Sequence, residues 1–187
     1  MRSIEAGTTT RTRGEVDVVI TSLTSALSSE EAPVRERARK ELVRYGRDAV
    51  DHLRHLLKLP ESRVRWEAVK ALGEIKGERA VDALVLSLSD EKRDIRWLAA
   101  QGLIACGDTA LVPLLEELLA HVDSVWVREG AGHVLRGLVD NPHYNIAAPV
   151  LDALNSTAAP FEVPVVAYEV LKTIRARRWM GRGVSRH

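Results

Sequence analysis

The side chains in this sequence that could carry out chemistry are few and widely spaced. His52 and His55 stand three positions apart, and Asp48 and Asp51 precede them, so on a helix these groups could approach one divalent cation. Neighbouring arginines and a lysine oppose a cation there, and no other part of the chain repeats the pair of histidines. We therefore expect no metal site.

A single cysteine, Cys106, rules out an internal disulfide bond. No histidine or carboxylate accompanies it in sequence, so we interpret it as a small core residue rather than a nucleophile. The chain also lacks a Gly-rich phosphate loop, a nucleophile elbow and a pair of catalytic carboxylates. We expect no catalytic residue and no cofactor, and the sparing use of cysteine favours the cytoplasm.

Three tryptophans are better candidates for a binding surface. Trp66 and Trp97 share one register position, where related segments of the chain carry Glu36 and Glu129. A position that accepts a carboxylate is expected to be at least partly exposed, and large exposed aromatics often anchor partner proteins. The alternative is that both indoles fill grooves between repeats. Trp126 either joins them or covers the edge of a repeat.

The C-terminal end is strongly basic. A short stretch without any acidic residue carries the candidate partner-binding residues Arg175, Arg177, Arg178, Trp179 and Arg182. Three interpretations of this segment are open. It is a solvated end, it docks on the chain's own acidic half, or it binds an acidic protein or RNA. We expect partner contact, because exposed ion pairs within the chain repay little of the entropy lost on docking.

Charge and hydropathy limit the other classes of partner. Residues 97–171 carry 2 Lys or Arg and 9 Asp or Glu, a net charge of −7, which opposes binding of a nucleic-acid duplex along this half. Nucleic acid is therefore expected only at the basic end. No apolar run is long enough to cross a bilayer, and residues 1–14 lack the apolar core of a secretory signal.

A repeated stretch must position all of these side chains. A branched aliphatic residue followed by Arg recurs at intervals of 30, 31 and 32 residues, with Ala and Leu four and eight positions after the aliphatic. Such spacing places the three apolar residues on one stripe of a helix. The stripes are Val34-Ala38-Leu42, Val64-Ala68-Leu72, Ile95-Ala99-Leu103 and Val127-Ala131-Leu135.

A second motif follows at the same period. Gly46, Gly77 and Gly107 each precede an alanine by three positions and a second leucine stripe, so glycine is expected to end one helix with a positive φ before the next begins. Each unit is thus a helical hairpin that is too short to be stable alone. Stacked hairpins bury a continuous core, which predicts an all-α, right-handed α-solenoid of about four and a half hairpins.

The repeats also define the domain organisation. We expect a flexible tail over residues 1–14, a repeat domain over 15–178 and a basic tail over 179–187. A final helix keeps the stripe as Val163, Ala167 and Leu171 and is expected to extend the row of first helices. The acids before each first helix, such as Glu31 and Glu61, are expected to cap that helix and to pair with the repeated arginines.

The paired motifs resemble the HEAT-like repeats of the phycobilin-lyase type over about residues 32–174. This resemblance implies the solenoid fold but serves many functions. Bilin lyases and HEAT-like DNA glycosylases are the enzyme alternatives, although no chromophore-handling residue can be mapped. Iron-binding HEAT-like hydroxylases use repeated His-Glu dipeptides, which this chain lacks. The function predicted is a non-enzymatic scaffold that binds another protein, whose identity the sequence leaves open.

Overall fold

The computed structural model describes residues 12–139 and 142–183; within them the side chains of 142–144 and 178–183 are not described. The described residues are helical, without a strand, and confirm the predicted α-solenoid. The α-helices are α1 (Arg13–Ala26), α2 (Ala32–Tyr45), α3 (Val50–Leu56), α4 (Ser62–Ile75), α5 (Glu78–Leu86), α6 (Arg93–Cys106), α7 (Asp108–Ala120), α8 (Val125–Val139), α9 (Ala148–Leu154) and α10 (Ala159–Gly183). The short 3-10 helices are η1 (Gly46–Ala49), η2 (Ser87–Ser89) and η3 (Pro142–Ala147).

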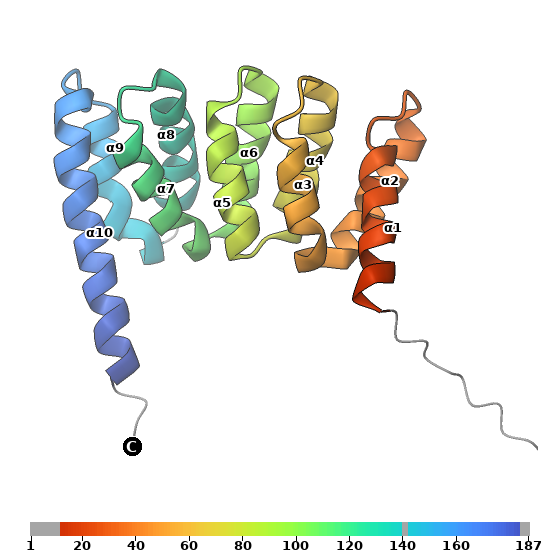
Figure 1. The fold of residues 1–187 in the computed structure, drawn as a ribbon. Helices are drawn as coiled ribbons and strands as arrows, with labels where there is room; N and C mark the ends of the chain where they lie inside the picture. Colours follow the sequence, from red (N-terminus) through yellow and green to blue (C-terminus); the bar gives the residue numbers. More distant parts are fainter. Residues whose placement is uncertain (1–11, 140–141, 184–187) are drawn as a thin grey trace, which may run out of the picture.

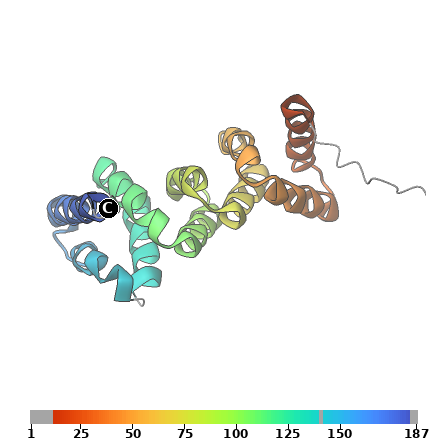
Figure 2. The same ribbon diagram turned by 90° about the horizontal axis from the view of Figure 1, so that it is seen from below.

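The helices form two rows that run side by side (Figure 1). The first helices of the hairpins, α2, α4, α6 and α8, pack in order along one row. The helices α1, α3, α5 and α7 form the other row, which Figure 2 shows from below. The core lies between the rows, where the alanine and leucine of every predicted stripe are buried. A fully buried leucine stabilises the fold by about 1.5–3 kcal/mol, so the stripes account for the stacking.

The repeated aliphatic position is buried in three repeats and exposed in one. Val64, Ile95 and Val127 are at most 3% exposed, whereas Val34 is 38% exposed. The reason is its place, because α2 is the first helix of its row and has a row neighbour on one side only. In α1 the buried residues are Ile20 and Thr24, and Leu27, which caps the C-terminal end of the helix, is also buried.

The predicted glycine turns are confirmed. Gly46, Gly77 and Gly107 have φ angles of 54°, 85° and 58°. Lys76, which ends α4, also has a positive φ of 60° with ψ at −169°, a region that side chains rarely occupy. At three of these positions glycine adopts the positive φ without strain. At the fourth, Lys76 adopts it with a strained backbone.

The C-terminal end departs from the expected arrangement. Val163, Ala167 and Leu171 are buried as predicted, but α10 packs on α7 and α9 rather than extending the row of α8. The longer connection after α8 contains η3 and is followed by α9, a helix of 7 residues that packs on α8. The next place beside α7, in the second row, is therefore taken by α10. The expectation that this helix would extend the first row is wrong.

Both ends of the helical region lie beyond the expected limits of 15 and 178. The first helix begins at Arg13, where Thr12 and Glu15 form a reciprocal capping box that satisfies two backbone N–H groups. The last helix continues to Gly183, so part of the expected basic tail over 179–187 is helical. Residues 1–11 of the expected N-terminal tail lie outside the described residues.

Candidate protein-interaction surface

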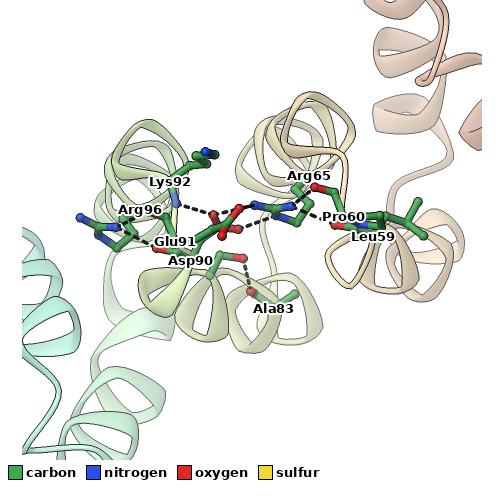
Figure 3. Close-up of polar contacts among 9 residues, drawn as sticks. Leu59, Pro60, Arg65, Ala83, Asp90, Glu91, Lys92 and Arg96 are labelled. Carbon is green, nitrogen blue, oxygen red and sulfur yellow. Dashed lines mark hydrogen bonds and ion pairs between the residues drawn. The ribbon is translucent and has the colours of Figure 1, made fainter.

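The repeated arginines hold each helix to the turn before it. In all four repeats the Nη1 group donates to backbone carbonyls five or six positions earlier in the chain, and Figure 3 shows two of these arginines, Arg65 and Arg96. The donors and carbonyls are Arg35 to Ser29 and Glu30, Arg65 to Leu59 and Pro60, Arg96 to Asp90 and Glu91, and Arg128 to Val122. The predicted structural role of this series is therefore confirmed, with carbonyls as the shared partners.

Three of these arginines also make contacts between repeats, two with a carboxylate and one with an aromatic ring. Arg35 pairs with Glu67 at 3.2 Å, and Arg65 donates to both carboxylate oxygens of Asp90 at 2.8 and 3.1 Å. These hydrogen bonds raise the pKa of Arg65 and keep its buried guanidinium charged. In the third repeat the guanidinium of Arg96 lies over the ring of Trp126, 4.8 Å from its centroid. The inter-repeat contact thus changes from a carboxylate to an aromatic ring.

The expected capping role is wrong for Glu31 and Glu61, whereas Asp90 accepts a hydrogen bond of 2.8 Å from the backbone N–H of Lys92 at the start of α6. Glu31 and Glu61 occupy the N-cap positions of α2 and α4, but neither side chain accepts a capping hydrogen bond. The preferred N-cap residues Ser, Thr, Asp and Asn have short side chains whose oxygen accepts a hydrogen bond from a backbone N–H of the first turn. Glutamate has a longer side chain and is not among them. The arginine Nη1 groups act instead on the carbonyls of the same turn.

Two tryptophans meet between α6 and α8. The indole of Trp97 is 58% exposed and that of Trp126 is 43% exposed, and both line a shallow hollow of about 140 Å³. Arg93, Arg96 and Glu129 are among the polar residues of its rim. The hollow therefore combines two tryptophans with two arginines, and both residue types are enriched at protein interfaces.

Trp66 lies elsewhere, although it shares a register position with Trp97. It is partly buried against the core, and the ammonium of Lys70 lies 4.7 Å from its ring centroid. Trp66 does not line the hollow formed by Trp97 and Trp126. The predicted partial exposure of Trp66 and Trp97 is confirmed, but the aromatic pair consists of Trp97 and Trp126.

Sequence reasoning missed several residues of this surface. Arg93 begins α6 and His133 lies near the middle of α8, with its imidazole Nε2 2.7 Å from the side-chain nitrogen of Gln101. Neither residue belongs to the repeated motif, so periodicity gives no signal for them. Glu129 entered the sequence analysis only as the register counterpart of Trp97, and the packing of α6 on α8 brings all three side chains to one hollow.

The described part of the basic end contacts the chain itself. Arg175 pairs with Glu116 of α7 at 2.6 Å, and both side chains remain about half exposed. This contact is the alternative in which the basic end docks on the chain's own acidic half. The expected partner contact is therefore corrected for Arg175. The side chain of Arg177 is exposed, whereas those of Arg178, Trp179 and Arg182 lie outside the described part of the chain.

His52, His55 and Cys106 take no part in this surface. The Nδ1 atom of His55 lies 2.7 Å from the carbonyl oxygen of Asp51, and burial raises the pKa of the Cys106 thiol. In residues 12–139 and 145–177 no group of three potential metal ligands comes together. Across the same described ranges no helix has the length and apolarity needed to cross a membrane.

The fold and surface define an α-solenoid with an exposed aromatic hollow on one row. Residues 20–103 match the family described as HEAT repeats, and this segment is therefore built of HEAT repeats. Phycocyanobilin lyase subunit alpha from Picosynechococcus sp. is 32% identical over 111 residues, which cover 58% of this chain and 39% of that relative. This chain thus spans well under half of that protein's length.

Two solved structures of engineered proteins from the Northeast Structural Genomics Consortium are also similar. Each is 20% identical in sequence and is matched over 89% of this chain, with TM-scores of 0.42 and 0.38. The matched regions cover 85% and 87% of those proteins.

Proposed function

We propose that this protein is a non-catalytic scaffold that binds another protein through the surface between α6 and α8. The observation that carries the proposal is the exposure of Trp97 and Trp126 around one hollow. Indoles bury a large apolar area when a partner covers them, and such residues supply most of the binding free energy at many interfaces. The cation–π contact from Arg96 supports it further, because it fixes the Trp126 ring before a partner arrives.

The decisive experiment is purification of the tagged chain from its native cell with identification of the bound protein by mass spectrometry. Replacement of Trp97 and Trp126 by Ala should then weaken binding of that protein by about tenfold to several hundredfold, or about 1–3 kcal/mol for each anchor. Phe161→Ala is the matched control, since Phe161 is 82% exposed on α10, away from this surface. Equal affinity of the double variant and the native chain would refute the proposal.

Trp66→Ala tests how far the binding surface extends. Its indole is partly buried beside Lys70, so its loss is expected to weaken binding less than loss of Trp97. The circular dichroism spectrum should remain helical in all three tryptophan variants, because the stripes of the core are unchanged. A larger loss of affinity for Trp66→Ala than for Trp97→Ala would show that the main binding residue lies on α4.

The basic end of α10 forms a second, separable part of the proposal. Arg177 is exposed in the last described turns, and an acidic partner or RNA is the ligand that suits it. Removing everything after Ile174 would also remove the pair of Arg175 with Glu116. Arg177→Glu is therefore the sharper test: binding at low salt should weaken, whereas unchanged binding would exclude this end from the interface.

Similarity to a phycocyanobilin lyase subunit favours a second candidate function, the handling of a bilin. Mixing the pure chain with phycocyanobilin tests it directly, because a bound linear tetrapyrrole changes its absorption spectrum and fluorescence. If the spectrum equals that of the free pigment, the scaffold remains the function proposed. Transfer of the pigment to a captured partner would show that the chain handles bilin and would replace the scaffold proposal.

A further inference from the structure

A second hollow lies on the other row of helices, between α3 and α5. Its volume is about 540 Å³, and it is independent of the tryptophan surface. Ala83, Leu57 and Leu86 provide its apolar wall, while Arg54 and Lys58 stand on the α3 side. A hollow with an apolar wall and a charged rim is suited to a short peptide segment.

The exposure of Leu86 is unusual for its position in the repeat. Its side chain is 55% exposed at the end of α5, where the aligned residues of α3 and α7 are His55 and Glu116. The polar residues at this register show that stacking of the repeats does not need an apolar side chain there. Leu86 therefore remains available to a ligand, next to the fully buried Ala83.

The carboxylates that line this hollow are already neutralised. Asp51 accepts two hydrogen bonds of 2.8 Å from Arg79, and Asp90 is held by Arg65. Within the described residues neither Arg54 nor Lys58 makes an ion pair. The net charge offered to a ligand is thus positive.

We propose that the hollow between α3 and α5 binds an acidic segment of another protein that carries apolar side chains. The carboxylates of the segment pair with Arg54 and Lys58, and one apolar side chain packs on Leu86 and Leu57. A polyanion such as RNA suits the site less well, because only two cations are unopposed and the wall between them is apolar.

The probe is a short fluorescein-labelled peptide of alternating Leu and Glu pairs, and binding is followed by fluorescence anisotropy. Two reference peptides replace either all Leu by Ser or all Glu by Lys. The Leu-Glu peptide should bind at least tenfold more tightly than either reference. Its affinity should fall as salt rises from about 0.1 to about 1 M, because the Debye length shrinks from about 10 to about 3 Å.

Two variants locate the binding to this hollow. The double variant R54E/K58E should weaken binding about tenfold, and Leu86→Ser should weaken it roughly threefold to tenfold. The matched control R37E/R136E makes the same change of charge at exposed positions on α2 and α8. If R54E/K58E proves unfolded by circular dichroism, the neutral variant R54Q/K58Q replaces it.

Three results would overturn the proposal. The first is equal binding of the Leu-Glu peptide and its Ser counterpart, and the second is an equal loss of affinity in R37E/R136E. The third is tighter binding of a single-stranded RNA oligonucleotide that competes with the peptide, which would assign the hollow to a polyanion. The tryptophan variants of α6 and α8 leave this hollow intact, so failure of one proposal is distinguishable from failure of the other.

Discussion

Arg65 offers the strongest test of how adjacent repeats are joined. Its side chain is 8% exposed, and its guanidinium donates to the carbonyls of Leu59 and Pro60 and to the carboxylate of Asp90 (Figure 3). Arg65→Ala removes all of these donors. The carboxylate of Asp90 is only 10% exposed and would keep the backbone N–H of Lys92 as its remaining partner. A nearly buried charge would then be poorly compensated.

The expected loss in the free energy of unfolding is about 3 kcal/mol. Removing one partner of a buried ion pair costs about 3–5 kcal/mol, and the lower end applies because Asp90 retains one donor. The contact of Arg65 with Glu91 adds little, since the Glu91 side chain is 65% exposed. With a urea m-value of about 2 kcal/mol/M, the unfolding midpoint should fall by about 1.5 M.

Urea unfolding is followed by circular dichroism and by tryptophan fluorescence, which should give coincident transitions. Arg65→Lys keeps the charge but loses the planar fork, so an intermediate loss is expected. The double-mutant cycle with Asp90→Ala should return a coupling of about 1–3 kcal/mol. These two variants separate the charge from the geometry of its hydrogen bonds.

Arg63 provides the matched control for this prediction. It lies on the same helix and also bridges two repeats, donating to both oxygens of Glu30 at 2.8 and 2.6 Å. Hydrogen bonding to Arg63 lowers the pKa of Glu30, but both groups are solvated. Arg63→Ala should leave the midpoint within the scatter of replicates. Equal midpoints for Arg65→Ala and Arg63→Ala would refute the reasoning that burial decides the strength of the contact.

Four further predictions concern the turns, the packing of the rows and Cys106. Lys76→Gly should raise the melting temperature by about 3 °C, because relief of a strained backbone worth about 1–3 kcal/mol exceeds the added freedom of the unfolded chain; a lower melting temperature would contradict this. Gly102→Ala should destabilise by about 1 kcal/mol, because the new Cβ would lie 3.1 Å from the Cα of Gly73, whereas Gly14→Ala has open space and should be neutral or stabilising in the same melt. Cys106 should react with iodoacetamide at least tenfold more slowly than glutathione at pH 8, since burial raises its pKa above the ordinary 9.0. The folded state favours the neutral thiol, so the contribution of Cys106 to the free energy of unfolding is full below pH 9 and is lost as the pH rises through the raised pKa. Unfolding measured at several pH values checks this.

Periodicity in the sequence was sufficient to predict the fold. The stripe of Ile95, Ala99 and Leu103 is buried as predicted, and Gly107 turns the chain because a residue without Cβ accepts a positive φ. These features are local, since they depend on residues within one or two helical turns. A local pattern that recurs at a fixed period can stack on itself in few ways, so the core followed from the sequence.

The candidate surface depended on tertiary structure. Trp66 and Trp97 share a register position, yet only Trp97 lines a hollow together with Trp126, whereas Trp66 is partly buried against the core. The sequence predicted that acids before the helices pair with the repeated arginines, but tertiary structure decided which arginine pairs with which acid, since Arg65 reaches Asp90, 25 residues further along the chain. The helical period determines which face a side chain occupies, whereas contacts across repeats depend on the shift and rotation of whole helices.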